Sequence, residues 1–263
     1  MLGIHQSLPK ILASLPIEAK SLGADTFQVF IRNNVNLKKR AISINEINKF
    51  NVALLQCGIS SFVVHASYAM NPCDPNQFNR CFETMRADLN FLRYTAGTNY
   101  CVVHPGSSKD LHVLDAIDNL HKLLQKLVPY IGNTSIALEF MSGAGTQIFS
   151  NPMEVKAIMD AFNDIPNLKI CFDTCHVFSA GYDVVECYEY LKDYIGVVHL
   201  NNSSALQGTH VDRHANIESG YIPPDKLLEV CKLRLNCNPS SPIILETPNS
   251  NILSDLEFLT KNL

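Results

Sequence analysis

The chain alternates short apolar runs, rich in β-branched residues, with longer segments whose apolar positions recur at helical spacing. Eight apolar runs predict strands at 2–5, 26–31, 60–65, 100–104, 134–139, 168–172, 195–200 and 242–246. The segments between and after them predict helices at 8–18, 43–57, 76–97, 110–129, 151–163, 184–193, 223–235 and 251–261. This alternation is typical of βαβ units and of a parallel sheet.

Local signals mark the ends of several predicted helices. Ser43 followed by Glu46 fits a capping box, and the pair Asn151-Pro152 places a proline in a first helical turn. Pro16 is expected to break or kink the first predicted helix, because proline lacks the amide hydrogen that a helix interior needs.

The alternating pattern runs through the chain without a linker segment, and this indicates its domain organisation. No stretch rich in proline, glycine or serine divides the chain, so we expect residues 1–263 to form one α/β domain. Eight parallel strands, each followed by a helix, predict a TIM (β/α)8 barrel with its active site at the C-terminal ends of the strands. An open, doubly wound sheet would produce similar local patterns and stays an alternative here.

Composition and charge narrow the class of protein. Hydrophobic residues make up 46% of the chain and charged residues 17%, which is typical of a globular rather than a disordered protein. The formal net charge of -4 provides no overall attraction to nucleic acid, so DNA contact would need a local basic surface or bound cations. Nine cysteines without a secretory leader favour reduced thiols in an intracellular protein.

No apolar run approaches the ~18 residues that a membrane-spanning helix needs. We therefore expect a soluble protein without a membrane partner, and a monomer by default. Its compartment would be the cytoplasm in a prokaryote or a cytoplasmic virus, and otherwise the nucleus.

Side chains that can bind metal end six of the eight predicted strands. They are His65, His104, Glu139, Asp173, His199 and Glu246. Taken alone, each of them is more often an ordinary polar residue than a metal ligand. The carboxyl ends of parallel strands, however, meet on one face of the sheet. Six such residues on one face predict a shared site, because converging charged groups need the compensation that bound cations supply.

Three further candidates lie in predicted loops on the same face. His176 follows Asp173 by three residues, and Asp212 and His214 are two apart in the segment His210-Val-Asp-Arg-His. Residues two apart in an extended loop point to one side, so Asp212 and His214 could chelate one ion. Taken alone, this segment is more often a solvent-exposed charged loop than a metal-binding loop.

Nine imidazole and carboxylate ligands are too many for one ion and suit two or three. Mixed histidine and carboxylate ligation fits zinc, manganese or iron, and such clusters bind and polarise phosphoryl oxygens. Of the two thiols nearby, Cys171 is expected in the core, facing away from Asp173, and Cys175 in packing or behind the ligands.

Several segments that contain these residues resemble the endonuclease IV family of abasic-site endonucleases. They are Asp173-Thr-Cys-His, Ala180-Gly-Tyr-Asp, His199-Leu-Asn, Val211-Asp-Arg-His, Ile244-Leu-Glu-Thr, His104-Pro-Gly-Ser, His65-Ala-Ser-Tyr and Gly3-Ile-His-Gln-Ser. The resemblance covers nearly the whole chain in order, and it implies a TIM barrel that holds three zinc ions, with Mn²⁺ as a substitute.

The resemblance also implies how the ligands divide among the ions. His65, His104 and Glu139 would hold the first zinc, Asp173, His199 and Glu246 the second, and His176, Asp212 and His214 the third. Glu139 would bridge the first two ions, and Glu139, Asp173 and Glu246 would be catalytic, with Glu246 orienting the attacking water.

The implied reaction is repair of double-stranded DNA by base excision. A metal-bridging hydroxide would cut the phosphodiester bond 5′ to an abasic site and leave a 3′-hydroxyl and a 5′-deoxyribose phosphate. Removal of blocked 3′ ends is expected as a related activity. Recognition would rely on a bent, unstacked lesion, because an abasic nucleotide costs little to flip.

The expected DNA contacts are less uniform than the metal ligands. Tyr68 matches a family position that enters DNA near the lesion, Arg213 is expected to contact phosphate, and Lys38, Lys39 and Arg40 form a basic run that could do so too. Val35 stands where the family often carries an intercalating arginine, Asn202 where it tends to carry an aspartate, and Glu218-Ser-Gly where it has another glycine-containing turn. These departures concern DNA contact rather than metal binding.

Two other functions are weighed against a nuclease. A metal-dependent sugar isomerase or epimerase would use Glu139, Asp173, His199 and Glu246, but it leaves the other five candidates without a role and lacks a lysine at a strand end. A DNA-damage binding protein without catalysis would be favoured by the loss of a ligand, yet all nine positions carry the expected residue type.

Overall fold

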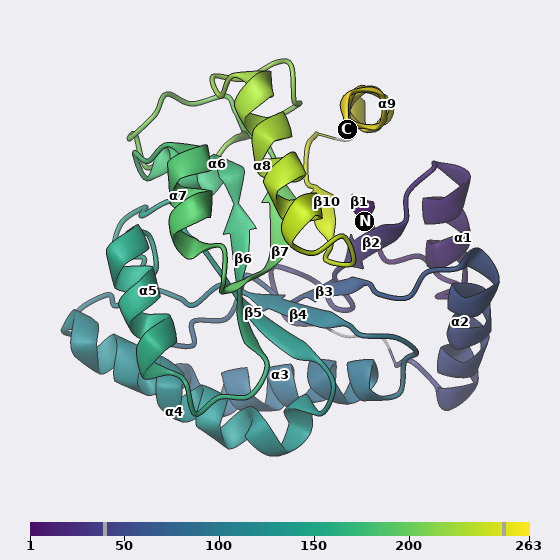
Figure 1. Cartoon of the computed structure of the whole chain (residues 1–263). Coiled ribbons are helices and arrows are strands. Elements are labelled where there is room, and N and C mark those ends of the chain that lie inside the picture. The colour runs from purple at the N-terminus through teal and green to yellow at the C-terminus, as the bar shows by residue number, and fades with distance from the viewer. Residues whose placement is uncertain (39–40, 249–250) are drawn as a thin grey trace.

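The computed structural model describes residues 1–38, 41–248 and 251–263. Within these ranges, eight parallel strands close into a barrel (Figure 1). In their order around the barrel they are β1 (Leu2–Gln6), β2 (Thr26–Val29), β3 (Val63–His65), β4 (Tyr100–Val103), β5 (Ser135–Glu139), β6 (Leu168–Asp173), β7 (Ile195–Leu200) and β10 (Ile243–Leu245), which pairs with β1 again. Closure confirms the predicted TIM barrel and excludes the open sheet.

The connecting helices lie outside the ring of strands (Figure 1). They are α1 (Ser14–Ser21), α2 (Ile44–Cys57), α3 (Phe78–Arg93), α4 (Val113–Ile131), α5 (Pro152–Ala161), α7 (Val184–Leu191), α8 (Pro224–Cys237) and α9 (Ile252–Asn262), with a short 3₁₀ helix, η1, at Pro75–Gln77. No helix in the described part of the chain is long and apolar enough to cross a membrane.

The first helix begins later than predicted. Helix α1 starts at Ser14, so Pro16 lies in its first turn, where a missing amide hydrogen breaks no helical hydrogen bond. Proline at this position marks the start of the helix, and the prediction that it breaks or kinks one is wrong.

A short helix and a short antiparallel pair of strands above the barrel were not predicted. Helix α6 (Thr174–Ser179) follows β6 at once, and Asp173 caps it by accepting a hydrogen bond from the amide of His176 at 2.8 Å. His176 therefore lies in a helix rather than in a loop. An antiparallel pair, β8 (Asn202–Ser203) and β9 (His214–Ala215), folds the segment that contains Asp212 back over the mouth of the barrel.

The barrel interior is filled by one layer of small and branched side chains beneath the mouth. This layer comprises Val63, Val102, Ala137, Cys171, Val197 and Ile244. Cys171 thus lies in the core as predicted, but it shares the inward side of β6 with Asp173. The prediction that it faces away from Asp173 is wrong, because residues two apart on a strand point to the same side.

The capping box of α2 allows a test of local stability. The Ser43 side chain accepts a hydrogen bond from the amide of Glu46, and the Glu46 side chain accepts one from the amide of Ser43. Ser43→Ala is expected to lower the free energy of unfolding by about 1 kcal/mol, because it removes the side-chain oxygen that caps the first turn. A fall in Tm of about 2–4 °C would be measured by calorimetry. Ser254→Ala, at an exposed position on α9, should leave Tm unchanged.

Candidate metal centre

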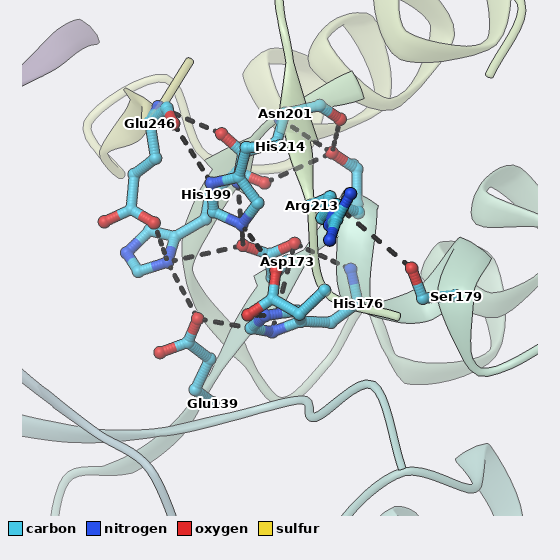
Figure 2. A network of polar contacts seen from close by, with 12 residues as sticks. Glu139, Asp173, His176, Ser179, His199, Asn201, Arg213, His214 and Glu246 are labelled. Atoms are coloured by element: carbon cyan, nitrogen blue, oxygen red, sulfur yellow. Dashed lines mark hydrogen bonds and ion pairs between the residues drawn. The ribbon is translucent and has the colours of Figure 1, made fainter. Parts of the chain in front are cut away.

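The nine predicted ligands gather at the carboxyl ends of the barrel strands. Figure 2 shows six of them converging from different elements: Glu139, Asp173, His176, His199, His214 and Glu246. Glu139 and Asp173 end their strands, and Glu246 directly follows β10. Contacts with Glu139 bring His65 and His104 to the same place. Strand ends and the first residues beyond them therefore supply most of the site.

Glu139 lies at the centre of the cluster and is almost fully buried. Its Oε2 atom is 3.0 Å from Nε2 of His65 and 3.1 Å from Nε2 of His104. Its Oε1 atom is 3.2 Å from Nδ1 of His199. Because the two oxygens face different histidines, the carboxylate is placed to bridge two neighbouring sites.

The second predicted set meets around Nδ1 of His199. That nitrogen is 3.4 Å from Oε2 of Glu246 and 3.8 Å from Oδ2 of Asp173, in addition to its contact with Glu139. Three carboxylate oxygens thus surround one imidazole nitrogen in a fully buried position. Such a concentration of negative charge away from water needs a cation or extra protons.

The third predicted set is built around Asp212. Its Oδ2 atom is 3.1 Å from Nε2 of His176, and its Oδ1 atom is 3.2 Å from Nε2 of His214. One ligand atom from each of these residues lies within 4.8 Å of the others. The Asp212 side chain is 47% exposed, so this set forms the solvent-facing edge of the cluster.

The hydrogen bonds of three histidines test whether the residues fit metal ions. The Nδ1–H groups of His65, His176 and His214 donate to backbone carbonyl oxygens at 2.7, 2.8 and 3.0 Å. A carbonyl can only accept, so each neutral ring presents a lone pair on Nε2 toward a carboxylate. The buried Nε2 of His214 lies 3.2 Å from Oδ1 of Asp212 but has no partner with hydrogen-bond geometry among the described residues. Metal-binding histidines show this arrangement, and the donor set fits zinc.

The carboxylates shift the pKa values of the histidines in the metal-free cluster. Burial alone would lower these values, but the surrounding acids raise the pKa of His199 and His214 to about 9. The same balance, with Asp173 as the largest contribution against burial, raises the pKa of His176 well above its usual value. Without metal, the cluster therefore holds protons in places where cations would replace them.

The acids respond to burial and to the histidines in opposite directions. Burial opposes their ionisation, yet the neighbouring histidines hold the pKa of Glu139, Glu246 and Asp212 below the usual range. For Asp173, burial dominates and raises the pKa. Three of the four acids therefore favour the ionised carboxylate form beside the histidine rings.

Two amide side chains support the acids and were not identified from the sequence. The Asn201 amide nitrogen donates to Oδ2 of Asp173 at 2.8 Å, and its oxygen accepts from the amide of Glu246 at 3.1 Å (Figure 2). Gln28, on β2, contacts both Glu246 and His199. These residues join acids and a histidine that lie on three different strands or strand ends.

The predicted DNA-contact residues lie in different places around the cluster. Tyr68 covers the first ligand set: its ring stacks on His104, with centroids 4.7 Å apart, and meets His65 edge-on at 5.0 Å. It nevertheless remains 44% exposed, so it forms part of the surface above these ligands. Arg213 is exposed, and its guanidinium has no partner among the residues that the structure describes.

Lys38 lies in the part of the mouth that adjoins Tyr68, because the ring centroids of Tyr68 and Phe30 are 5.0 Å apart. It lines a cleft of about 520 Å³ together with His5, Phe30 and Asn34. The cleft reaches the cluster, because Nδ1 of His5 is 3.3 Å from Oε1 of Glu246. Lys39 and Arg40, the other predicted contacts, lie outside the described residues. Val35, nearby, is 73% exposed.

Comparison with known proteins identifies the family. Residues 17–262 match the family described as xylose isomerase-like TIM barrel. The chain is 34% identical to a probable endonuclease 4 of Acholeplasma laidlawii over 95% of its length and 90% of that protein. Its fold matches endonuclease IV from Thermus thermophilus with a TM-score of 0.86 and 28% identity, over 99% of this chain and 98% of that one.

A D-allulose 3-epimerase from Methylomonas sp. shares the fold alone, with a TM-score of 0.73, 16% identity, and coverage of 100% of this chain and 96% of that one. Sugar epimerases therefore match only the architecture. The curated relative and the Thermus structure match both the sequence and the architecture over nearly the full length of each chain. The chain accordingly belongs to the endonuclease IV family.

Proposed function

We propose that the protein is a DNA repair endonuclease that hydrolyses the phosphodiester bond 5′ to an abasic site in double-stranded DNA. The products would be a 3′-hydroxyl and a 5′-deoxyribose phosphate, and blocked 3′ ends would be a second class of substrate. The observation that carries the proposal is the bridging position of Glu139 between two histidine sets, beside a third set around Asp212. Family membership supplies the substrate class.

The nine residues would hold three zinc ions in the sets predicted from the sequence. Zinc held there would supply Lewis acidity and charge neutralisation to the phosphodiester and to its attacking water. Three dications would also change the formal charge of the chain from -4 to about +2, because 3 × 2 is added to -4. The added charge would lie at the mouth, where phosphate would bind.

The protein's own groups orient the reactants. Glu246 lies at the junction between the cluster and the cleft beside His5, which suits a carboxylate that orients water and accepts its proton. Tyr68 covers the first ligand set, where it would pack against the unstacked sugar and exclude bulk water. Arg213, whose guanidinium is exposed, would contact a phosphate.

A sugar isomerase or epimerase is the rival function for this fold, and two observations weigh against it. The set around Asp212 adds a third group of ligands that such chemistry does not need. Lys169 is the only lysine in the described barrel strands, and it lies near the amino end of β6, away from the cluster. The nuclease proposal uses all nine ligands.

The proposal predicts metal content and cleavage together. Purified protein is expected to contain about three zinc ions per chain, as measured by elemental mass spectrometry. It is also expected to nick a DNA duplex that contains an abasic site. Removing the metal with a chelator should abolish the nick and zinc should restore it, because the acids and imidazoles alone cannot neutralise the phosphate.

The same duplex without the lesion is the control. Sequencing gels would place the cut on the 5′ side of the abasic site. Zinc-replete protein that leaves the duplex intact and instead turns over a ketose or an aldose would replace the proposal by the rival function.

A further inference from the structure

Gln28 is a polar residue in the interior of the barrel, and it is fully buried. From β2 it reaches past β1 and β10 to β7, since its Oε1 atom lies 2.8 Å from Nε2 of His199. Its Nε2 atom contacts Oε1 of Glu246 and lies 3.0 Å from Nδ1 of His5. One amide group therefore touches three side chains that come from three other strands or strand ends.

The contacts fix the orientation of this amide. A carboxylate oxygen of Glu246 can only accept, so the NH₂ group of Gln28 must face it. The opposite orientation would set the amide oxygen against the carboxylate in a buried position, which is strongly unfavourable. The amide oxygen consequently faces His199 and accepts a hydrogen bond from its Nε2–H group.

This orientation decides which nitrogen of His199 is free to bind metal. With the proton on Nε2, the lone pair lies on Nδ1, the atom that Glu139, Glu246 and Asp173 surround. Three of the other candidate ligands behave in the opposite way: His65, His176 and His214 donate from Nδ1 to carbonyls and offer Nε2. Within the described part of the chain, no backbone carbonyl accepts from Nε2 of His199, and the amide oxygen of Gln28 does so instead.

We infer that Gln28 is the positioning residue of the second ligand set. It selects the tautomer of His199 that presents Nδ1 to a divalent cation, and its NH₂ group holds Oε1 of Glu246 so that Oε2 faces the same point. The inference rests on the proposed function, because it assigns the second zinc to His199, Glu246 and Asp173. Mutation of a residue that supports a metal ligand in this way typically lowers metal affinity by about 10–100-fold.

The alternative is that Gln28 merely fills space in the barrel. Gln28→Met separates the two, because methionine has a similar length and volume but neither donates nor accepts a strong hydrogen bond. Gln28→Glu keeps an acceptor toward His199 but replaces the donor toward Glu246 by a carboxylate oxygen, so it tests the tautomer of His199 and not the metal affinity. Gln125→Met is the matched control, since the Gln125 amide donates to Asp164 at 2.8 Å on an exposed surface.

The test uses the zinc-loaded protein and two readouts besides activity. Competition with a chelator is expected to show one of the three zinc ions bound about 10–100-fold more weakly in Gln28→Met, with the other two unchanged. Nitrogen NMR of the histidine rings should show His199 as the Nε2–H tautomer in the wild type and in Gln28→Glu. In Gln28→Met this single signature should be lost in the fraction of protein that has released the weakly bound ion.

Two results would overturn the inference while leaving the proposed function intact. One is a wild-type His199 that carries its proton on Nδ1, which needs no variant and so does not depend on whether a variant folds. The other is a folded Gln28→Met protein with wild-type affinity for all three zinc ions. Wild-type protein that binds no zinc or leaves abasic DNA uncut would instead overturn the proposed function.

Discussion

Glu139→Gln is expected to lower the rate of abasic-site incision on the order of 10³-fold, the largest effect of any single substitution considered for this protein. Glutamine keeps the shape of the side chain but replaces one charged oxygen by an NH₂ group. In the wild type, Oε2 faces His65 and His104 while Oε1 faces His199. Either orientation of the new amide therefore places a donor where one of two ions should bind, and two ligand sets lose a shared carboxylate.

Metal analysis distinguishes this explanation from simple misfolding. We expect the variant to retain the zinc of the outer set around Asp212 and to lose one or both of the others, with an unchanged circular dichroism spectrum. Glu83→Gln is the control, because Glu83 pairs with Arg86 on the exposed side of α3. A Glu139→Gln protein that cuts abasic DNA at the wild-type rate would exclude a bridging role for this carboxylate.

The barrel could be predicted because each strand is a short apolar run, and the spacing of the runs leaves room for one helix between strands. These local patterns do not predict that the sheet closes, since an open sheet has the same patterns. The position of α1 could not be predicted either. Apolar residues from Leu8 to Leu15 keep helical spacing, but Pro16 favours a helix that starts just before it.

The metal cluster could be predicted to the extent that its residues end strands. His65, His104 and Glu139 are examples: each ends an apolar run, so chain position alone places them on one face. The shape of the segment containing Asp212 depends on the pairing of β8 with β9, two residues each, which is too short to leave a periodic signal.

Alternation along the strand could have predicted that the Gln28 side chain points into the barrel. In Thr26-Phe-Gln-Val-Phe, the apolar residues Phe27 and Val29 point to one side of β2, and Gln28 points to the other. In a closed barrel that other side is the interior, where an amide needs partners. The identity of its partners depends on the order of strands around the barrel, and no local pattern in the sequence contains that information.

Asp212→Ala is expected to remove one zinc ion and to lower incision on the order of 10²-fold, while the other two ions stay bound. The reason is the position of the residue. Among the described residues, Asp212 contacts the histidines of the outer set, His176 and His214, and its side chain is half exposed. Glu139 and Asp173 still lie near the buried His176 when Asp212 is lost. The metal-free protein should lose some free energy of unfolding near neutral pH, because Asp212 is one of the acids that raise the pKa of His176 and His214.

His214→Ala provides the second half of this experiment. Each single variant should lose the same ion, so the double variant should be no slower than the slower single variant, because an ion can be lost only once. Asp164→Ala is the control: it breaks a comparable contact, His121 Nε2 to Asp164 Oδ1 at 2.7 Å, at the surface and away from the cluster. Multiplicative losses in the double variant, or three zinc ions still bound to Asp212→Ala, would show that Asp212 and His214 do not share an ion.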